Sequence, residues 1–298
     1  MGLRLKFNLV ILATFLVGFC ATALLLNWRF DHDAREEALA SARIMIEAAD
    51  AIRNYTSKEV TPVVGHELEG KFVRASVPAF AARAHFAALK SESPEYSYKE
   101  AALNPTNLEN RTADWEADIV STFRQPHSPR EIISERNTPT GPQLNLARPL
   151  TVSEESCLAC HSQPSAAPAS MTALYGTANG FGWHLHEVIG AQIVSLPLSA
   201  PLGKAHRTLA LFLLLLTGIF AVMMVMLNVL LHYLIIQPVR TISSAATDIS
   251  LGHVAPELRL KGNDEISMLF SAFNRMRRSV EHAMRMLEEH ESLAGSKS

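Results

Sequence analysis

Two of the chain's three cysteines stand close together, with a histidine directly after the second. They are Cys157, Cys160 and His161, in the stretch SEESCLACHSQP. Two thiols at this spacing can form thioether bonds to both vinyl groups of a porphyrin, and the adjacent imidazole can ligate the iron. Cysteines two residues apart also occur in redox dithiols and in zinc sites, so the spacing alone leaves three chemistries open.

The surrounding sequence favours haem. A redox dithiol is expected on a strand-to-helix turn after an apolar strand, whereas the polar stretch TVSEES precedes Cys157. A structural zinc ion needs four ligands, and the sequence has no second cysteine pair. His184 and His186 would complete such a set only by leaving His161 unused. We therefore predict one covalent c-type haem per chain, bound through Cys157 and Cys160, with His161 as its proximal iron ligand.

The composition excludes some function classes. Of the 298 residues, 48% are hydrophobic and 19% are charged, and the net charge is −2. A chain this close to neutral has no electrostatic attraction to DNA or RNA, so no nucleic-acid partner is expected. The sequence contains no catalytic triad, no paired-carboxylate signal and no phosphate-binding loop. We predict that the protein is not an enzyme.

Two apolar runs determine where the cysteine motif lies. Residues 7–26 and 209–236 are each long enough to cross the ~30 Å hydrocarbon core of a lipid bilayer as a helix. Arg4 and Lys6 precede the first run and acidic residues follow it, so the positive-inside rule places the N-terminus in the cytoplasm. Basic residues just before the second run count against this orientation, but the first helix usually dominates. We predict a bacterial inner-membrane protein with both termini in the cytoplasm and residues 31–205 in the periplasm, where c-type haem is attached.

Between the two runs, helical patterns come first and strand patterns follow. Helices are predicted over residues 34–55, 77–89 and 110–123, the last capped by Asn110. Strands rich in β-branched residues are predicted over residues 131–136, 143–150 and 187–198. The cysteine motif falls in a loop between the last two strands. This order of elements predicts an α+β domain with an antiparallel sheet.

The sequence after the second run predicts two helices joined by an extended connector. The first follows Pro238 and ends at Gly252. The second opens with Asp264 and Glu265, as the helix dipole favours. Its apolar residues follow heptad spacing, which is typical of helices that pack along partner helices. They are Ile266, Leu269, Phe273, Met276, Val280, Ala283 and Leu287.

This pattern resembles a HAMP signalling module over residues 237–290, followed by a flexible tail at 291–298. One position departs from the family pattern, because Ser267 stands where a glycine is common. The resemblance implies a parallel homodimer that pairs through its HAMP helices. No kinase or cyclase follows, so the output is expected to pass to a separate cytoplasmic signalling protein.

The external segment resembles a family of periplasmic haem-c sensor domains that was first recognised in cyanobacteria and long catalogued as a domain of unknown function. The similar segments are Arg53–Thr56, Tyr96–Pro105, Arg136–Thr138, Ala147–Pro149, Cys157–His161 and Gly180–Gln192. The resemblance spans about residues 31–198. It implies a PAS-like fold that is often tethered to a HAMP module.

The resemblance also implies an iron ligand opposite His161, provided by a sulfur side chain of the N-terminal helix. Met45 is the only sulfur-containing residue of that helix, and we predict that it is this ligand. Other residues that could ligate the iron are His66, His127, His184 and Met171, and a vacant position is a further alternative. His184 and His186 alternate along a predicted strand, so at most one of them would face the haem.

Three arginines lie in the family-like segments and are predicted to bind the anionic haem propionates. They are Arg53, Arg136 and Arg148. Trp183 is predicted to form a wall of the haem pocket.

Together these features predict a membrane-bound sensor that relays redox state, or a diatomic gas bound at the iron, through its HAMP module. One alternative is a membrane-anchored monohaem cytochrome that transfers electrons. Another is a receptor for a small organic ligand in which the haem is structural.

Overall fold

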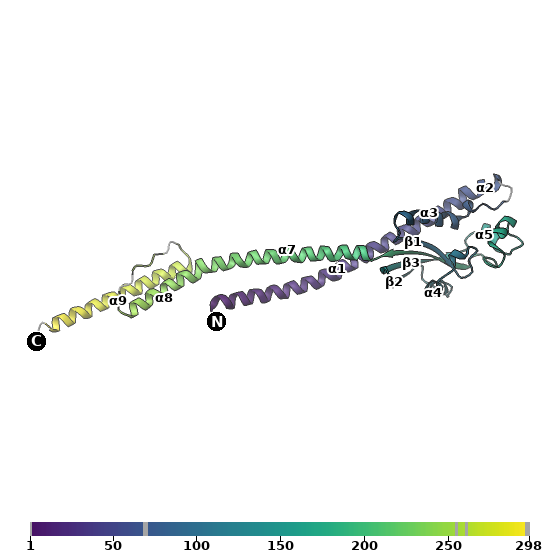
Figure 1. Cartoon of the computed structure of the whole chain (residues 1–298). Coiled ribbons are helices and arrows are strands. Elements are labelled where there is room, and N and C mark those ends of the chain that lie inside the picture. The colour runs from purple at the N-terminus through teal and green to yellow at the C-terminus, as the bar shows by residue number, and fades with distance from the viewer. Residues whose placement is uncertain (1, 68–70, 254–255, 260–261, 296–298) are drawn as a thin grey trace. The chain divides into compact units, whose positions relative to one another are not determined.

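The computed structural model describes residues 2–67, 71–253, 256–259 and 262–295, and the side chains of these except residues 3, 65–67 and 287–295. The chain divides into two compact units, residues 18–211 and residues 1–17 with 212–298. The first unit contains the mixed helix-and-strand domain, and the second contains long apolar helices and the C-terminal helices (Figure 1).

Four antiparallel strands form the centre of the domain. They are β1 (Ser97–Ala102), β2 (Ile132–Thr138), β3 (Gly141–Thr151) and β4 (Val188–Pro197). Their order in the sheet is β1-β4-β3-β2, and each neighbouring pair is antiparallel. The predicted α+β class with an antiparallel sheet is confirmed, and the three predicted strands correspond to β2, β3 and β4.

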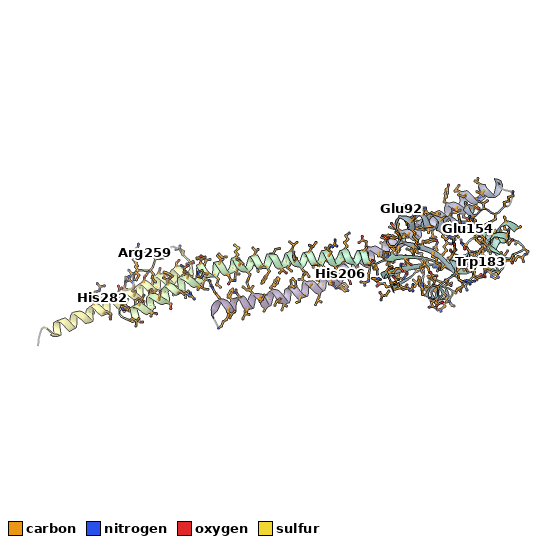
Figure 2. The ribbon with its side chains drawn as sticks, viewed as in Figure 1. Glu92, Glu154, Trp183, His206, Arg259 and His282 are labelled. Atoms are coloured by element: carbon orange, nitrogen blue, oxygen red, sulfur yellow. The ribbon has the colours of Figure 1, made fainter. Side chains whose placement is uncertain are left out.

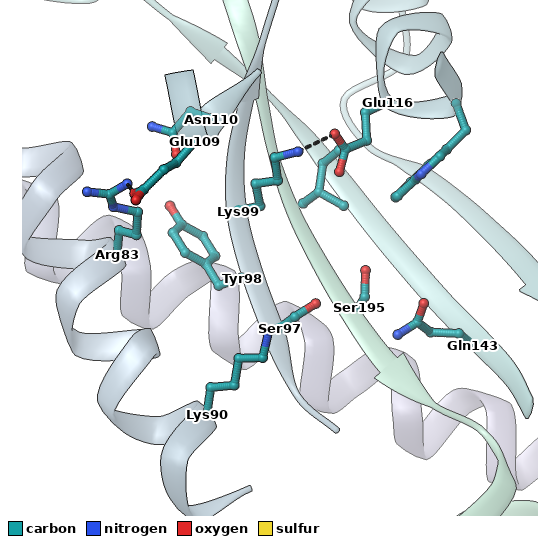
Figure 3. A pocket seen from close by; sticks show the side chains of 12 residues that line it. Arg83, Lys90, Ser97, Tyr98, Lys99, Glu109, Asn110, Glu116, Gln143 and Ser195 are labelled. Atoms are coloured by element: carbon teal, nitrogen blue, oxygen red, sulfur yellow. Dashed lines mark hydrogen bonds and ion pairs between the residues drawn. The ribbon is translucent and has the colours of Figure 1, made fainter. Parts of the chain in front are cut away.

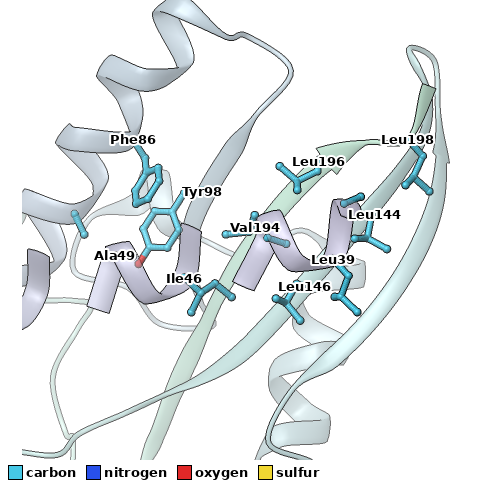
Figure 4. Packing of buried hydrophobic residues seen from close by; sticks show 13 residues of the cluster. Leu39, Ile46, Ala49, Phe86, Tyr98, Leu144, Leu146, Val194, Leu196 and Leu198 are labelled. Atoms are coloured by element: carbon cyan, nitrogen blue, oxygen red, sulfur yellow. The ribbon is translucent and has the colours of Figure 1, made fainter. Parts of the chain in front are cut away.

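One face of the sheet is covered by α1 (Leu3–Tyr55) and α3 (Pro78–Glu92). α1 is a single helix, and the helix predicted over residues 34–55 is its second half. Small residues at every third or fourth position, among them Ala38, Ala42 and Ala49, let α1 lie close against the strands. The strands contribute Tyr98, Leu144, Leu146, Val194 and Leu196 to this core (Figure 4).

The opposite face is covered by α4 (Asp114–Phe123), whose Val120 and Phe123 are buried against the sheet. This helix begins at Asp114, and the prediction that Asn110 caps it is wrong. Glu116 reaches back and accepts a hydrogen bond from the Ala113 N–H at 2.8 Å, which fixes the start of the helix there. Asn110 ends the short 3-10 turn η3 (Leu108–Asn110) instead.

Two expectations about the segment between β3 and β4 are also wrong. The cysteine motif forms a helix, α5 (Glu155–His161), rather than a loop, and α6 (Ala169–Tyr175) follows it. His184 and His186 do not alternate along a strand, because β4 begins only at Val188. His186 takes a left-handed conformation, with φ at 66°, in the turn before the strand.

Within the part of the chain that the structure describes, two helices are long and apolar enough to cross a membrane, by length and composition. They are α1 and α7 (Ser199–Leu231), which continues through the π-helical turn η4 (His232–Ile236). Within the second unit, Asn8 and Asn228 exchange two side-chain hydrogen bonds of 3.0 and 3.1 Å. These two bonds join the beginning of α1 to the end of α7.

The C-terminal helices are α8 (Gln237–Ser250) and α9 (Glu265–Gly295). Ala245 and Phe273 pack between them, together with Leu258 of the connector. Gly252 has φ at 81° and ends α8 as predicted. α9 continues to Gly295 through the first part of the predicted tail, and residues 296–298 and Leu260 of the connector lie outside the described residues.

Candidate functional site

The cysteine motif lies on one face of α5. Cys157, Cys160 and His161 are three and four positions apart, and residues at these separations lie on the same side of an α-helix. Both thiols are half-buried and free of disulfide bonds. The Glu154 carbonyl accepts a hydrogen bond from the Cys157 N–H at 3.2 Å, which closes the first turn. The helix therefore presents two thiols and one imidazole together.

The His161 ring is fixed by its surroundings. Its Nδ1 lies 2.7 Å from the carbonyl oxygen of Gly180. A carbonyl oxygen can only accept, which assigns the proton to Nδ1 and leaves the Nε2 lone pair free. The Trp183 ring stacks on the imidazole with centroids 3.8 Å apart. Metal-ligating histidines are typically oriented in this way by a hydrogen bond at the second nitrogen.

Burial lowers the pKa of His161, against the opposing effect of the Gly180 hydrogen bond. The ring is therefore neutral near pH 7, which is the state in which a histidine ligates a metal.

Gly180 is the part of this site that no side-chain chemistry in the sequence reveals. Its φ is 81°, a conformation that glycine adopts readily. A Cβ at this position would collide with Thr106 Oγ1 and lie 2.8 Å from the Thr106 Cα. The Thr106 hydroxyl also lies 3.4 Å from His161 Nδ1. Gly180 and Thr106 thus fit against each other beside the imidazole.

The Cys160 thiol differs from the thiol of a reactive dithiol. Burial raises the pKa of Cys160, and the neighbouring Cys157 raises it further. Reactive dithiols have the opposite property, a lowered thiol pKa. Among the described residues, no group of three or more His, Cys, Asp and Glu side chains is placed to hold a metal ion. The residues present therefore fit a covalently attached haem better than zinc or redox-dithiol chemistry.

A hydrogen bond connects the start of α5 to the segment that continues α1. α1 passes at Tyr55 into the π-helical segment η1 (Thr56–Val60), and α2 (Thr61–Glu67) follows. The Ser57 hydroxyl donates a hydrogen bond of 2.8 Å to a carboxylate oxygen of Glu154, the residue before α5. Glu154 and Trp183 both lie toward the end of the domain that carries α5 (Figures 1 and 2).

The three predicted propionate-binding arginines lie at separate places, and each has a partner within the chain. Arg53 pairs with the buried Glu100 of β1 at 2.7 Å. Arg148 pairs with Glu47 of α1 and with Glu131. The Arg136 guanidinium lies 4.2 Å above the ring of Trp115, on the α4 face of the sheet. The structure brings Cys157, Cys160, His161 and Trp183 together and does not bring these arginines together. Their binding of propionates stays a prediction.

Met45 is half-buried and packs against the core between α1 and the sheet. It precedes Ser57, the α1-side contact of α5, by twelve residues, or ~18 Å along a helix. Of the alternatives, Met171 is 3% exposed, whereas the His184 side chain is 85% exposed. His127 takes a left-handed conformation in an exposed turn, and the His66 side chain lies outside the described residues. The sixth iron ligand stays a prediction.

A pocket of about 370 Å³ lies along β1, between α3 and α4, and none of the α5 residues lines it (Figure 3). Two ion pairs neutralise four of its five charged residues, and Lys90 adds one further positive charge. Lys99 pairs with Glu116 at 2.6 Å, and Arg83 pairs with Glu109. The pocket is therefore separate from the cysteine motif and presents no concentrated charge to an ionic ligand.

Two family models and a solved structure are similar to parts of this chain. Residues 31–197 match the family model described as Tll0287-like, and residues 230–282 match the HAMP domain. A similar solved structure is the crystal structure of the cyanobacterial heme-protein Tll0287, at 18% identity and a TM-score of 0.41. That similarity covers 54% of this chain and 95% of the other. No curated protein sequence matches the chain.

Both resemblances drawn from the sequence are thereby confirmed, one to a family first recognised in cyanobacteria and one to HAMP. The first match covers more than half of the chain, from Asp31 near the end of the apolar part of α1 to the end of β4. The chain belongs to the Tll0287-like family and carries a HAMP domain that begins in the last turn of α7.

Proposed function

We propose that this protein is a membrane-bound signal transducer whose external domain, residues 31–205, carries one covalent c-type haem. Apolar segments 7–26 and 209–236 cross the inner membrane, with both termini in the cytoplasm. The HAMP module, residues 237–290, passes the state of the periplasmic domain to a cytoplasmic signalling partner.

One observation carries the proposal: α5 presents Cys157, Cys160 and His161 on a single face, and the Gly180 carbonyl fixes the imidazole with Nε2 free. The thiols would hold the haem, and His161 would be its proximal ligand. When bound, the haem supplies an iron whose charge changes with redox poise and which can take a small diatomic molecule as ligand.

The chain's own contacts supply a route from α5 to the membrane. Glu154 is hydrogen-bonded to Ser57 of η1, and η1 continues α1. One turn earlier, Arg53 of α1 pairs with Glu100 of β1. A displacement of α5 therefore reaches α1 through Glu154, while the ion pair holds α1 to the sheet. The HAMP match supports signal transduction over simple electron transfer, because an electron carrier needs only an anchor.

The first test is a pyridine haemochrome assay on the purified full-length chain. We expect the spectrum of a doubly thioether-linked haem and haem staining that survives denaturing electrophoresis. Cys157→Ala with Cys160→Ala should abolish both. Cys20→Ala, which changes the cysteine of the first apolar run, is the matched control and should keep both. Wild-type protein without covalent haem would overturn the proposal.

A second test asks whether the haem domain controls the HAMP module. Met276 is 52% exposed on α9, so Met276→Cys in a Cys20→Ser background can be cross-linked with a bismaleimide in membranes. We expect the cross-linking yield to differ between ferricyanide-treated and ascorbate-treated protein. Parallel titration of the haem spectrum with CO, NO and cyanide distinguishes gas binding from redox sensing. Identical yields in every state would refute signal relay, even with haem attached.

A further inference from the structure

The second half of α1 leaves one helical face uncovered. Ile44 and Tyr55 are 69% and 63% exposed, although both side chains are largely apolar. Ala51 lies between them on the same side and is also exposed. The opposite face of the same helix is occupied by the sheet, where Ala42, Ile46 and Ala49 are buried. α1 therefore presents an apolar surface that no other described part of the domain covers.

The residues of this face follow heptad spacing. They are Ser41, Ile44, Ala48, Ala51 and Tyr55, at successive separations of 3, 4, 3 and 4. This is the spacing by which two helices pack along a shared seam. Ala48 lies at the edge of this face, because it is half-buried and one side of it packs against the core of its own domain. The Ser41 hydroxyl already donates a hydrogen bond to the Glu37 carbonyl of its own helix at 3.0 Å. None of the five side chains has a polar group that must stay in water, apart from the terminal hydroxyl of Tyr55.

The distribution of charge on α1 suits a second copy of the chain as the occupant of this face. In a parallel pair related by twofold symmetry, each seam residue faces its own equivalent, so any charge there would meet a like charge. The five residues carry no charge. The charged side chains of this stretch lie on other faces of α1 and are bonded within their own domain. Arg43 pairs with Glu131, Glu47 with Arg148, and Arg53 with Glu100.

We propose that the face formed by Ser41, Ile44, Ala48, Ala51 and Tyr55 is a parallel dimer seam outside the membrane. The proposal goes beyond pairing through the HAMP module. It is continuous with that pairing because α1 is one helix from Leu3 to Tyr55. The HAMP helix α9 has a similar exposed apolar face, which includes Leu269, Met276 and Val280. Chains held parallel by a membrane and a HAMP dimer bring two copies of α1 together.

The size of the seam determines how it must be tested. It is ~21 Å long, counting 1.5 Å per residue, and five residues from each chain bury much less than the ~800 Å² per partner of a stable interface. The seam therefore acts together with the membrane helices and the HAMP module. The experiment accordingly uses the full-length chain in membranes.

Single cysteines in a Cys20→Ser background are cross-linked with a short bismaleimide. Ile44→Cys and Ala51→Cys test the seam. Asn54→Cys is the matched control, because Asn54 is exposed and uncharged but lies on a different side of α1. Met276→Cys reports HAMP pairing, and a haemochrome assay reports haem attachment. We expect Ile44→Cys and Ala51→Cys to give at least fivefold more covalent dimer than Asn54→Cys, and Ile44→Glu to reduce the yield at Ala51→Cys.

The outcomes separate this proposal from the proposed function. Cross-linking at Met276→Cys, with Ile44→Cys and Ala51→Cys no better than Asn54→Cys, would overturn the seam and leave the HAMP dimer intact. Equal yields at all three α1 positions would also overturn it, because contact would then not follow the helical face. If the protein proves to lack haem, Cys157→Ala and Cys160→Ala are added so that Ile44→Cys is the single thiol. Dimers at that position would then support the seam and count against haem attachment alone.

Discussion

Gly180 acts on His161 through its backbone. Its carbonyl accepts a hydrogen bond from the imidazole N–H, and its missing side chain lets the turn approach Thr106. Gly182, two residues on, has nearly the same φ of 80° but open space where a Cβ would be. An alanine at either position would adopt an unfavourable left-handed conformation, but only an alanine at 180 would also collide with Thr106. Comparing the two substitutions therefore isolates the effect of the collision beside the imidazole.

We predict that Gly180→Ala shifts the haem reduction potential, because displacing the carbonyl weakens the hydrogen bond that makes His161 a stronger donor to the iron. Gly182→Ala should leave the potential near that of the wild type. In both variants the left-handed conformation of the alanine lowers the free energy of unfolding by roughly 1 kcal/mol. Spectroelectrochemical titration measures the potential, and a haemochrome assay shows that both variants keep covalent haem. Equal shifts in the two variants would contradict this role of Gly180.

Glu100 shows the cost of burying a charge at the interface of α1 and the sheet. It is 3% exposed, and it accepts hydrogen bonds from Arg53 at 2.7 Å and from the Tyr98 hydroxyl at 2.8 Å. Burial has the larger effect on the pKa of Tyr98 and raises it, and the nearby Glu100 charge raises it further. Tyr98 thus remains a neutral donor.

We predict that Glu100→Ala lowers the free energy of unfolding by about 3 kcal/mol, because Arg53 would be left as a largely buried charge without its partner. The double variant Glu100→Leu/Arg53→Met should stay within about 1 kcal/mol of the wild type, since two apolar side chains need no compensation. Chemical unfolding in detergent, followed by the fluorescence of Trp115 and Trp183, provides the measurement. A double variant less stable than Glu100→Ala would refute this interpretation.

At the scale of elements, α1 changes from α-helix to the π-helical turn η1 where it meets α5. π-helical turns inside longer helices often occur at functional sites. Glu154 is placed there by two hydroxyls. Ser57 of η1 donates to it at 2.8 Å, and Ser156 of α5 donates at 3.2 Å. Only the first bond joins two different elements.

We predict that Ser57→Ala or Glu154→Ala reduces the redox-dependent difference in HAMP cross-linking at Met276→Cys, while the haem stays attached. Ser156→Ala is the control, because it removes a bond to the same carboxylate from within α5. The double variant Ser57→Ala/Glu154→Ala should reduce the cross-linking difference no further than either single variant, since both substitutions remove the same hydrogen bond. An effect of Ser156→Ala as large as that of Ser57→Ala would argue against transmission through this bond.

The start of α9 has its own pH dependence. The Ser267 hydroxyl and backbone N–H lie beside the Asp264 carboxylate and lower its pKa, and the N–H donates it a hydrogen bond of 2.8 Å. A carboxyl whose pKa is lower in the folded state stabilises the fold above its ordinary value of ~3.9 and loses that effect as pH falls through the folded pKa. We predict constant amide protection in the first turn of α9 from pH 7 to about 4, and a decline below it. Asp264→Asn should remove this decline, as hydrogen-exchange protection factors would show.

The sequence predicted the elements that follow regular patterns. The β-branched runs of β2, β3 and β4, the apolar runs, and the heptad positions of α9 were all recognisable from residue type and spacing. β1 was missed because its sequence, SYKEAA, contains poor strand formers. Its Glu100 is buried only because Arg53, 47 positions earlier, comes to lie against it. A single sequence does not reveal such long-range pairs, and this also explains why Gly180 was not identified as a partner of His161.

At the scale of the whole chain, the signal must pass along helices that carry few polar groups. Asn8 and Asn228 are an exception, because their side chains bond each other across two apolar helices. Polar side chains within apolar segments commonly join neighbouring helices there, at about 0.6 kcal/mol per interaction on average. Thr217 of α7 instead bonds the Leu213 carbonyl of its own helix.

We predict that Asn228→Leu loosens the association of the two membrane helices by about 1 kcal/mol, because both hydrogen bonds to Asn8 are lost. The redox-dependent difference in cross-linking at Met276→Cys should shrink accordingly. Thr217→Val, which removes a hydrogen bond within one helix, should leave the difference unchanged. Asn8→Leu should reproduce the effect of Asn228→Leu, and the double variant should add little to it.

The segment that carries the cysteine motif begins and ends at the same point of the sheet. The Val152 N–H donates to the Glu187 carbonyl at 3.0 Å, and the His186 N–H donates to the Val152 carbonyl at 2.8 Å. Residues 152–187 form the connection between β3 and β4, its two ends are hydrogen-bonded to each other, and none of its residues belongs to a strand. The sheet and its two cores can therefore fold independently of this connecting segment. For the covalent haem that we propose, the cysteines would then stay accessible to the attachment machinery after the rest of the domain has folded, and the haem would be added as a late step of maturation.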